Sequence, residues 1–210
     1  RANGIQSFVD CAQSVGACSV NVNELGCDYL SSNAHKWLCG PKGTGFFYAR
    51  PERMVQLVPA HVGAGSLARA DLVTGEAVLQ PNGRRFEYGT RAHMLFVGVA
   101  ASLAWFDALG WPNVHGHIAC LASYLKQSIL ARKHLQLLTP LPAEQSAGLT
   151  ACVVIGHNAS DVSVDLRREA RPRRIAVRVV PHYNAIRIAT AHFNNLQDID
   201  EVMSALDEYA

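Results

Sequence analysis

The chain has 210 residues, of which 49% are hydrophobic and 17% are charged, so it can bury a substantial core and is not typical of a disordered polymer. Its 19 basic and 17 acidic side chains give a formal net charge of +2, and no block of lysine or arginine gathers this excess into a stripe, which argues against a nucleic-acid partner. No apolar run approaches the roughly 18 to 20 residues of a membrane-spanning helix, so we expect no membrane partner.

Three short apolar runs in the first part of the chain predict buried strands. They are Ile5–Val9, Cys27–Leu30 and Gly45–Tyr48, each bounded by polar residues or by glycine and proline. The segment Pro59–Arg85 is rich in glycine, alanine and polar residues and is long for a connection without secondary structure. Loops of this kind are usually functional or mobile.

Helical periodicity begins at His93. The apolar side chains of His93–Leu109 recur on one face, and Gly110 followed by Pro112 predicts the end of this helix. A second helix is expected over Val114–His134.

The remaining chain predicts an α+β arrangement. Its expected strands are Leu135–Leu138, Thr150–Ile155, Ile175–Val179 and Ala185–Ile188, with a helix over Ser160–Ala170. Asn195 is expected to cap a final amphipathic helix, with Asp198 near its positive end. The basic stretch Arg167–Arg174 lies between a predicted helix and strand and lacks interleaved aromatic residues, which favours a solvated turn.

Six cysteines are scattered through apolar segments without C-x-x-C spacing, at positions Cys11, Cys18, Cys27, Cys39, Cys120 and Cys152. This pattern predicts buried, reduced thiols and therefore a cytoplasmic protein. The chain starts with arginine and enters an apolar run within a few residues, without the features of an export signal. We therefore expect it to be part of a longer polypeptide.

Polar side chains follow two of the predicted strands. Asp10 and Gln13 follow the first, while Asn33, His35 and Lys36 follow the second, with Lys36 standing 26 positions after Asp10. The carboxyl ends of strands in an open α/β sheet are where ligands bind, so both sets are expected to face one crevice. The flanks of the lysine are largely apolar, and a lysine kept from water holds its proton less tightly and becomes a usable nucleophile.

Each candidate taken alone has a simpler explanation. Asp10 could cap a turn, Lys36 could be a surface lysine, Arg187 could form a strand salt bridge, and Gly89 with Thr90 could make a turn. The segment GPKGTG does not fit the nucleotide P-loop pattern.

Two histidines raise the question of a metal. His115 and His117 are two positions apart near a predicted helix start, so they point to different helix faces. No metal site is predicted.

Four motifs taken together are more specific than any residue alone. They are DCAQSVGA, SNAHKW followed by GPKGTGF, RFEYGTR, and IRIATAHFNNLQDID. In this order and over nearly the whole chain, they resemble the class V aminotransferase family, pyridoxal phosphate enzymes of fold type I that include cysteine desulfurases, isopenicillin N epimerase-like proteins and carbon-sulfur lyases. The resemblance implies an α/β fold. Residues 1–92 would be part of the large PLP-binding domain, with its N-terminal portion missing, and residues 93–210 the interdomain helix and a smaller α+β C-terminal domain.

The resemblance also implies roles around pyridoxal phosphate. Lys36 would form the Schiff base with the cofactor and then move the α proton of the substrate. Asp10 would pair with the ring nitrogen, and Gln13 would bond the ring oxygen. The small Ala12 would let the ring lie flat.

Further roles concern the phosphate, the partner and the substrate. His35 and Asn33 would hold the phosphate. Gly89 and Thr90 resemble the segment that reaches the neighbouring subunit's phosphate, which implies a homodimer. Arg187 would grip the α-carboxylate of an amino-acid substrate, because a two-pronged donor suits a carboxylate.

The reaction stays open at this point. Desulfurases of the family take up sulfur on a loop cysteine shortly before the carboxylate arginine, but Tyr183 stands near that place and Cys152 falls in a predicted buried strand. The motifs therefore favour an epimerase, lyase or transaminase, all of which begin by forming a carbanion at the α carbon. A desulfurase and a non-catalytic dimerisation module remain alternatives.

The resemblance lacks a counterpart for the family's N-terminal portion, which carries the phosphate-binding turn and the side chain that stacks on the ring. We therefore expect a fragment, a nicked product or half of a split enzyme, with a partner chain supplying the rest.

Overall fold

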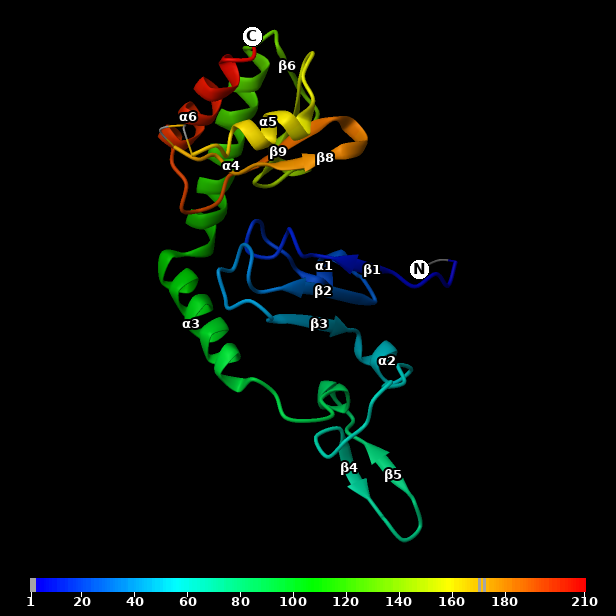
Figure 1. Ribbon diagram of the computed structural model, residues 1–210. Helices are drawn as coiled ribbons and strands as arrows, with labels where there is room; N and C mark the ends of the chain where they lie inside the picture. Colours follow the sequence, from blue (N-terminus) through cyan, green and yellow to red (C-terminus); the bar gives the residue numbers. More distant parts are fainter. Residues whose placement is uncertain (1–2, 170, 172) are drawn as a thin grey trace. The chain divides into compact units, whose positions relative to one another are not determined.

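The computed structural model describes residues 3–169, 171 and 173–210, which form two compact units. The first contains Arg1–Val15 and Ser19–Trp105, and the second contains Gly16–Cys18 and Phe106–Ala210. Figure 1 draws the elements of both. Each unit has its own sheet and its own core.

The first unit is built on a three-stranded sheet of β1 (Phe8–Asp10), β2 (Tyr29–Asn33) and β3 (Gly45–Ala49), in the order β1-β2-β3 (Figure 1). β1 and β2 are parallel, whereas β2 and β3 are antiparallel. The short helix α1 (Val22–Leu25) lies between the first two strands in the sequence. The predicted sheet is confirmed, but β2 begins and ends later than predicted.

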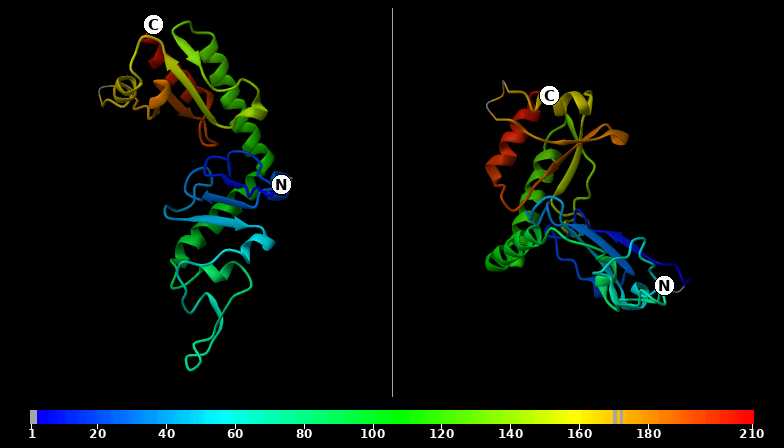
Figure 2. Two further views of the ribbon diagram at one scale, coloured as in Figure 1. Left: turned by 90° about the vertical axis from the view of Figure 1, so that its right-hand side faces the viewer. Right: turned by 60° about the horizontal axis from the view of Figure 1, so that its bottom comes forward.

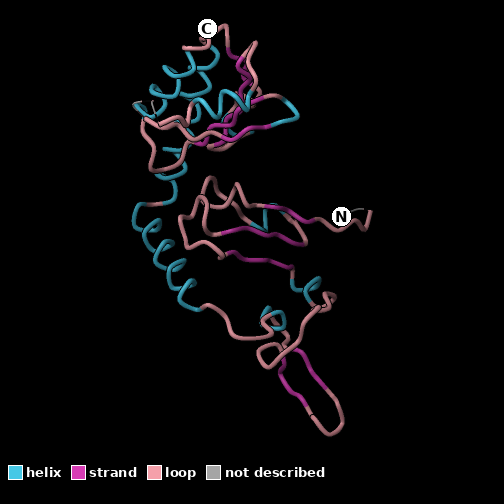
Figure 3. The backbone as a smooth tube through the Cα atoms, viewed as in Figure 1, coloured by secondary structure: helices cyan, strands magenta, loops and turns pink. Residues whose placement is uncertain are grey.

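The long connection after β3 contains secondary structure of its own. It holds α2 (Pro51–Met54), the antiparallel strands β4 (Leu67–Ala70) and β5 (Ala77–Leu79), and a 3-10 helix over Gly83–Phe86, as Figure 3 shows. Asp71 makes the hairpin possible, because its Oδ1 accepts the backbone N–H groups of Val73 (2.8 Å) and Thr74 (3.2 Å) and closes the turn.

Two consecutive helices follow, and the first has the predicted bounds. It is α3 (His93–Leu109), and it ends at Gly110, which has φ +82° and donates its N–H to the Phe106 carbonyl. The second, α4 (Trp111–Leu130), starts earlier than predicted because Pro112 lies in the first turn, where proline is tolerated. No single helix of the described chain could span a membrane; only α3 and α4 together pass that test, and they are bent by 82°.

The second unit contains an antiparallel four-stranded sheet. Its order is β6 (Leu135–Leu137), β7 (Leu149–Val154), β9 (Ala185–Ala189) and β8 (Arg178–Val180). β7 alternates half-buried and buried side chains along its length, as expected for a strand with one face on a core. Short 3-10 helices over Ala143–Gln145 and Pro181–Tyr183 lie in the connections.

Helices cover this sheet and complete its core. α4 packs on β6 and β7 and lies beside α6 (Leu196–Asp207), which Figure 2 shows from two further sides. α6 carries the predicted cap: Asn195 Oδ1 accepts the Asp198 N–H and Asp198 Oδ2 accepts the Asn195 N–H, both at 3.0 Å. The buried side chains come from all these elements, including Leu125, Cys152, Leu166, Ile186, Met203 and Leu206.

The helix predicted over Ser160–Ala170 is shorter in the structure. It is α5 (Ala159–Asp165), and Ala170 itself lies outside the described residues. At its end, the Asp165 carbonyl accepts the Arg168 backbone N–H at 3.0 Å and the Arg171 Nε–H at 3.1 Å, so this helix-end acceptor is satisfied without a further helical turn. The strand predicted at Ile175–Val179 is β8, which starts only at Arg178.

Candidate active site

The candidate site is at the edge of the first sheet where β1 and β2 end. Because the two strands are parallel, with Asp10 opposite Ser31, the segments that follow them leave the sheet at the same edge. One segment carries Ala12 and Gln13 and the other carries Lys36. The backbone segments that carry the two sets of polar residues therefore meet at one sheet edge, as the sequence predicted.

Side chains join the two segments. Three hydrogen bonds run from residues 32–37 to three consecutive residues after β1: Ser32 Oγ to the Cys11 carbonyl (3.0 Å), Asn33 Nδ2 to the Ala12 carbonyl (3.2 Å) and Trp37 Nε1 to Gln13 Oε1 (3.0 Å). These bonds hold the aspartate-bearing segment against the lysine-bearing segment. Sequence reasoning assigned no role to Ser32 or Trp37, although Trp37 stands beside the lysine in the HKW motif.

Asp10 occupies the carboxyl end of β1 and is exposed. Its Oδ1 accepts the Ala12 N–H at 2.9 Å, which fixes the direction of the carboxylate. It takes part in no ion pair with the described part of the chain. The second carboxylate oxygen can therefore receive a ligand.

The lysine loop turns its apolar residues inward and its functional residues outward. Trp37 and Leu38 are 6% and 3% exposed, whereas His35 and Lys36 are exposed. The expectation that the flanks keep Lys36 from water was therefore wrong for this chain taken alone. The physical reason is that Trp37 and Leu38 occupy the interior themselves.

Helix α3 anchors the same loop. Ser102 Oγ donates to the Leu38 carbonyl, and a Cβ on Gly98 would come within 2.5 Å of the Pro41 side chain. Thr44 Oγ1 closes the loop on the Pro41 carbonyl at 2.5 Å. The lysine is thus presented by a loop that is held at several points.

Gly89 and Thr90 lie in an exposed loop of the first unit. Neither forms a hydrogen bond with the residues that the structure describes, and a Cβ on Gly89 would meet open space. The neighbouring Arg91 folds back instead, donating to the Phe86 carbonyl at 3.0 Å and covering the ring of Tyr88. The structure therefore leaves the Gly89–Thr90 backbone accessible.

Arg187 belongs to the second unit, in β9, where it is half-buried. Its neighbours Ile186 and Ile188 point into the core, so alternation places Arg187 on the opposite face. Within the described ranges it has no carboxylate partner, unlike Arg171 and Arg173 of the same unit. The salt-bridge alternative is not supported, and the guanidinium can bind an external anion.

The residues relevant to sulfur transfer also lie in the second unit. Tyr183, near the place of the family's loop cysteine, is 68% exposed in the connection between β8 and β9. Cys152 is fully buried in β7, and burial raises the pKa of its thiol to about 12. Cys152 is therefore unsuited to nucleophilic chemistry.

All six cysteines are thiols, but they are not all buried as predicted. Cys11 and Cys27 are buried like Cys152, whereas Cys39 and Cys120 are exposed. Among the described residues, no group of three or more histidine, cysteine and acidic side chains could hold a metal ion.

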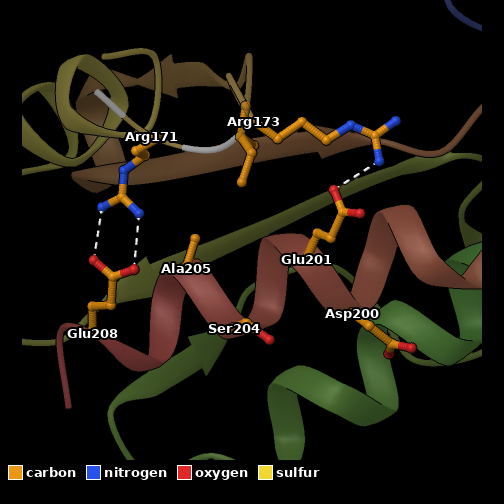
Figure 4. Close-up of a pocket in the computed structure, with 8 residues that line it drawn as sticks. Arg171, Arg173, Asp200, Glu201, Ser204, Ala205 and Glu208 are labelled. Atoms are coloured by element: carbon orange, nitrogen blue, oxygen red, sulfur yellow. Dashed lines mark hydrogen bonds and ion pairs between the residues drawn. The ribbon is translucent and has the colours of Figure 1, made fainter. Parts of the chain in front are cut away.

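Two arginines of the predicted basic stretch, Arg171 and Arg173, line a groove beside α6, shown in Figure 4. Arg171 binds Glu208 through two contacts of 2.9 and 3.0 Å, and Arg173 binds Glu201 at 2.7 Å. The groove contains none of the predicted site residues. Arg171 and Arg173 thus form ion pairs with acidic side chains of the same unit, whereas the sequence predicted a solvated turn.

Comparison with known sequences decides the family. The sequence profile of aminotransferase class-V matches residues 1–202. The chain belongs to the aminotransferase class-V family. Enzymes of this family use pyridoxal phosphate, so the predicted family and its cofactor are confirmed.

Individual class-V relatives include two activities. A cysteine desulfurase from Cronobacter sakazakii is 28% identical over 97% of this chain and 50% of its own length. Isopenicillin N epimerase from Streptomyces clavuligerus is 28% identical over 99% of this chain and 53% of its own length. The chain thus spans about half the length of the curated relatives it matches.

A solved structure shows the same fold. The apo structure of a cysteine desulfurase from Thermococcus onnurineus NA1 superposes with a TM-score of 0.86 and 25% identity, covering 99% of this chain and 53% of that one. The predicted α/β class, as part of a fold type I enzyme, is confirmed.

Proposed function

We propose that this chain carries the lysine-bearing part of a pyridoxal phosphate site, in a protein that acts on an α-amino acid. The observation that supports this most strongly is the set of hydrogen bonds between residues 32–37 and 11–13, which holds Lys36, Gln13 and Asp10 at one sheet edge. In a class-V chain, these are the positions at which the motifs lead us to expect the cofactor.

The polar groups at this edge fit the cofactor. Asp10 has a carboxylate oxygen free to receive the proton on the ring nitrogen, and Gln13 has an NH2 group that Trp37 does not use. Asn33 Oδ1 is buried and has no hydrogen-bond partner among the described residues, so this amide has an unsatisfied acceptor. The second N–H of the Asn33 amide remains for the phosphate, with His35 exposed beside it.

When bound, pyridoxal phosphate supplies an electron sink that allows an amino acid to lose its α proton. Lys36 would hold the cofactor covalently through Nζ and, once released by substrate, accept and return that proton as a positioned amine. Asp10 would keep the ring nitrogen protonated. Ala12 would limit the bulk next to the ring.

Arg187 would recognise the substrate carboxylate. It is the half-buried arginine of β9 without a carboxylate partner in the described chain, and a guanidinium offers two parallel donors to a carboxylate. We infer the substrate class, an α-amino acid, from this residue.

The protein would work as a homodimer, with further chain completing each site. The accessible backbone at Gly89 and Thr90 supports a contact with a neighbouring subunit's phosphate. Residues 1–92 would belong to the large domain and residues 93–210 to the interdomain helix and small domain. Because the chain spans about half of its relatives, a covalent or separate segment would supply the remainder.

For the reaction, we favour epimerisation, elimination or transamination. Tyr183 stands where a desulfurase would need a cysteine, and Cys152 is buried. A cysteine desulfurase is the second candidate, because relatives with that name match over nearly the whole chain. A panel of amino acids assayed for keto acid, inverted enantiomer and sulfide separates these reactions.

The test of the cofactor site is reduction with borohydride followed by peptide mass mapping of the intact protein. We expect a yellow protein whose reduced cofactor adduct is on Lys36. Lys36→Ala should abolish the adduct, and Lys42→Ala, at an exposed lysine of the same loop, should keep it. A protein that stays colourless with added pyridoxal phosphate would instead support a non-catalytic dimerisation module.

A further inference from the structure

The side chain of Trp37 is one residue from Lys36 but points inward, and its indole Nε1–H donates to Gln13 Oε1 at 3.0 Å. We propose that Trp37 is a positioning residue that orients the Gln13 amide so that its NH2 group faces the cofactor ring. This inference rests on the proposed function, because it assigns the role of Gln13 in that same site.

Donor chemistry determines which way the amide lies. The indole Nε1–H can only donate, so the Gln13 atom 3.0 Å away must be the acceptor Oε1. The reverse orientation would place two donors against each other. The NH2 group must therefore point away from Trp37.

The indole is well placed to impose this orientation. Trp37 is 6% exposed, and the next residue, Leu38, is 3% exposed with its carbonyl bound by Ser102 of α3. Gln13 is half-buried and its segment is fixed separately, through the Asn33 bond to Ala12. A rigid donor thus faces an amide that could otherwise rotate.

An oriented NH2 group would stabilise negative charge on the ring oxygen of the cofactor. Without this hydrogen bond, the negative charge on the ring oxygen is less stable. The oxygen then binds the nearby protonated nitrogen of Lys36 more strongly, and that nitrogen loses its proton only at higher pH. The pH midpoint of the visible absorbance change of the bound cofactor should then rise.

The experiment compares Trp37→Phe with wild type in the intact, cofactor-loaded protein. We expect the absorbance midpoint to rise by about 1 pH unit and the dissociation constant for pyridoxal phosphate to rise by about tenfold. Trp105→Phe, which removes an indole that is 50% exposed on α3, is the matched control and should change neither. An unchanged midpoint in Trp37→Phe would overturn the inference.

A double variant separates positioning from general damage. In a Gln13→Leu background the amide is absent, so adding Trp37→Phe should produce no further shift in the midpoint. A shift of undiminished size there would contradict action through Gln13.

A readout without cofactor keeps the inference testable if Trp37→Phe does not fold. In the cofactor-free protein, the Trp37 indole proton should exchange slowly with solvent by NMR, and at least about tenfold faster in Gln13→Leu. Equal exchange rates would contradict the inference. Failure of wild type to bind cofactor at Lys36 would instead remove the proposed function, a separate outcome.

Discussion

Asn33 at the end of β2 donates from Nδ2 to the carbonyl of Ala12, in the segment that follows β1, at 3.2 Å. The two residues are 21 positions apart in the sequence, so the bond forms only when the two parallel strands are in register. It holds the backbone between Asp10 and Gln13, the two residues proposed to bind the cofactor ring.

Replacing Asn33 by leucine should weaken both folding and cofactor binding. The Ala12 carbonyl would lose its donor, at a cost of about 1 kcal/mol in the free energy of unfolding, and the loop beside the ring would loosen. Asn113→Leu is the control, because it removes a similar side-chain bond from α4 to the carbonyl of Leu109, the last residue of α3 (2.9 Å). Denaturant unfolding and cofactor titration should show lower stability in both variants but weaker cofactor binding only for Asn33→Leu.

Replacing Arg187 by lysine should impair substrate binding more than chemistry. Loss of the two-pronged contact should raise KM by about 10- to 100-fold, corresponding to about 1.5 to 3 kcal/mol, with a smaller change in kcat. Arg178→Lys is the matched control, because Arg178 is the register partner of Arg187 on β8 and is exposed. Similar kinetics in the two variants would argue against the assigned role of Arg187.

Mixing two inactive variants should restore activity if sites are shared between subunits. Lys36→Ala removes the amine, and Thr90→Arg should block the phosphate of the neighbouring subunit. Random exchange of subunits in a homodimer leaves about a quarter of the sites with both wild-type residues, so about a quarter of the activity should return. No recovery after verified subunit exchange would show that Thr90 serves its own subunit's site or none.

Protonation of Asp28 should lower the stability of the fold in acid. The Ser7 backbone N–H and then the Arg53 guanidinium lower the pKa of the Asp28 carboxyl from 3.8 to about 2. Because the folded pKa is the lower one, this stabilisation is present above pH 3.8 and is lost as the pH falls toward 2.

Thermal melting at a series of pH values tests this prediction. Asp28→Asn should lower the melting temperature at neutral pH and flatten its decline between about pH 4 and 2. Asp161→Asn, at an exposed carboxyl of α5, is the control and should keep the wild-type profile. If Asp28→Asn melts with the same dependence on pH as wild type, then groups other than Asp28 cause the loss of stability in acid.

Much of the architecture could be predicted from local patterns. The periodic run His93–Leu109 and its glycine stop gave the bounds of α3, and the cap at Asn195 gave the start of α6. Both depend on interactions within a few residues, which sequence spacing records directly. The four motifs likewise identified the family, because residue types in a given order are preserved in the sequence itself.

The sequence by itself thus determined the family, the kinds of element and the order of the polar residues that follow β1 and β2. Only the tertiary structure decided that Trp37 and not Lys36 turns inward, that Trp37 binds Gln13, and that the loop after β3 contains a hairpin. The physical reason is that an apolar neighbourhood does not specify which side chain fills the interior. That choice, like the bond across 24 positions from Trp37 to Gln13, depends on strand register and on packing against α3.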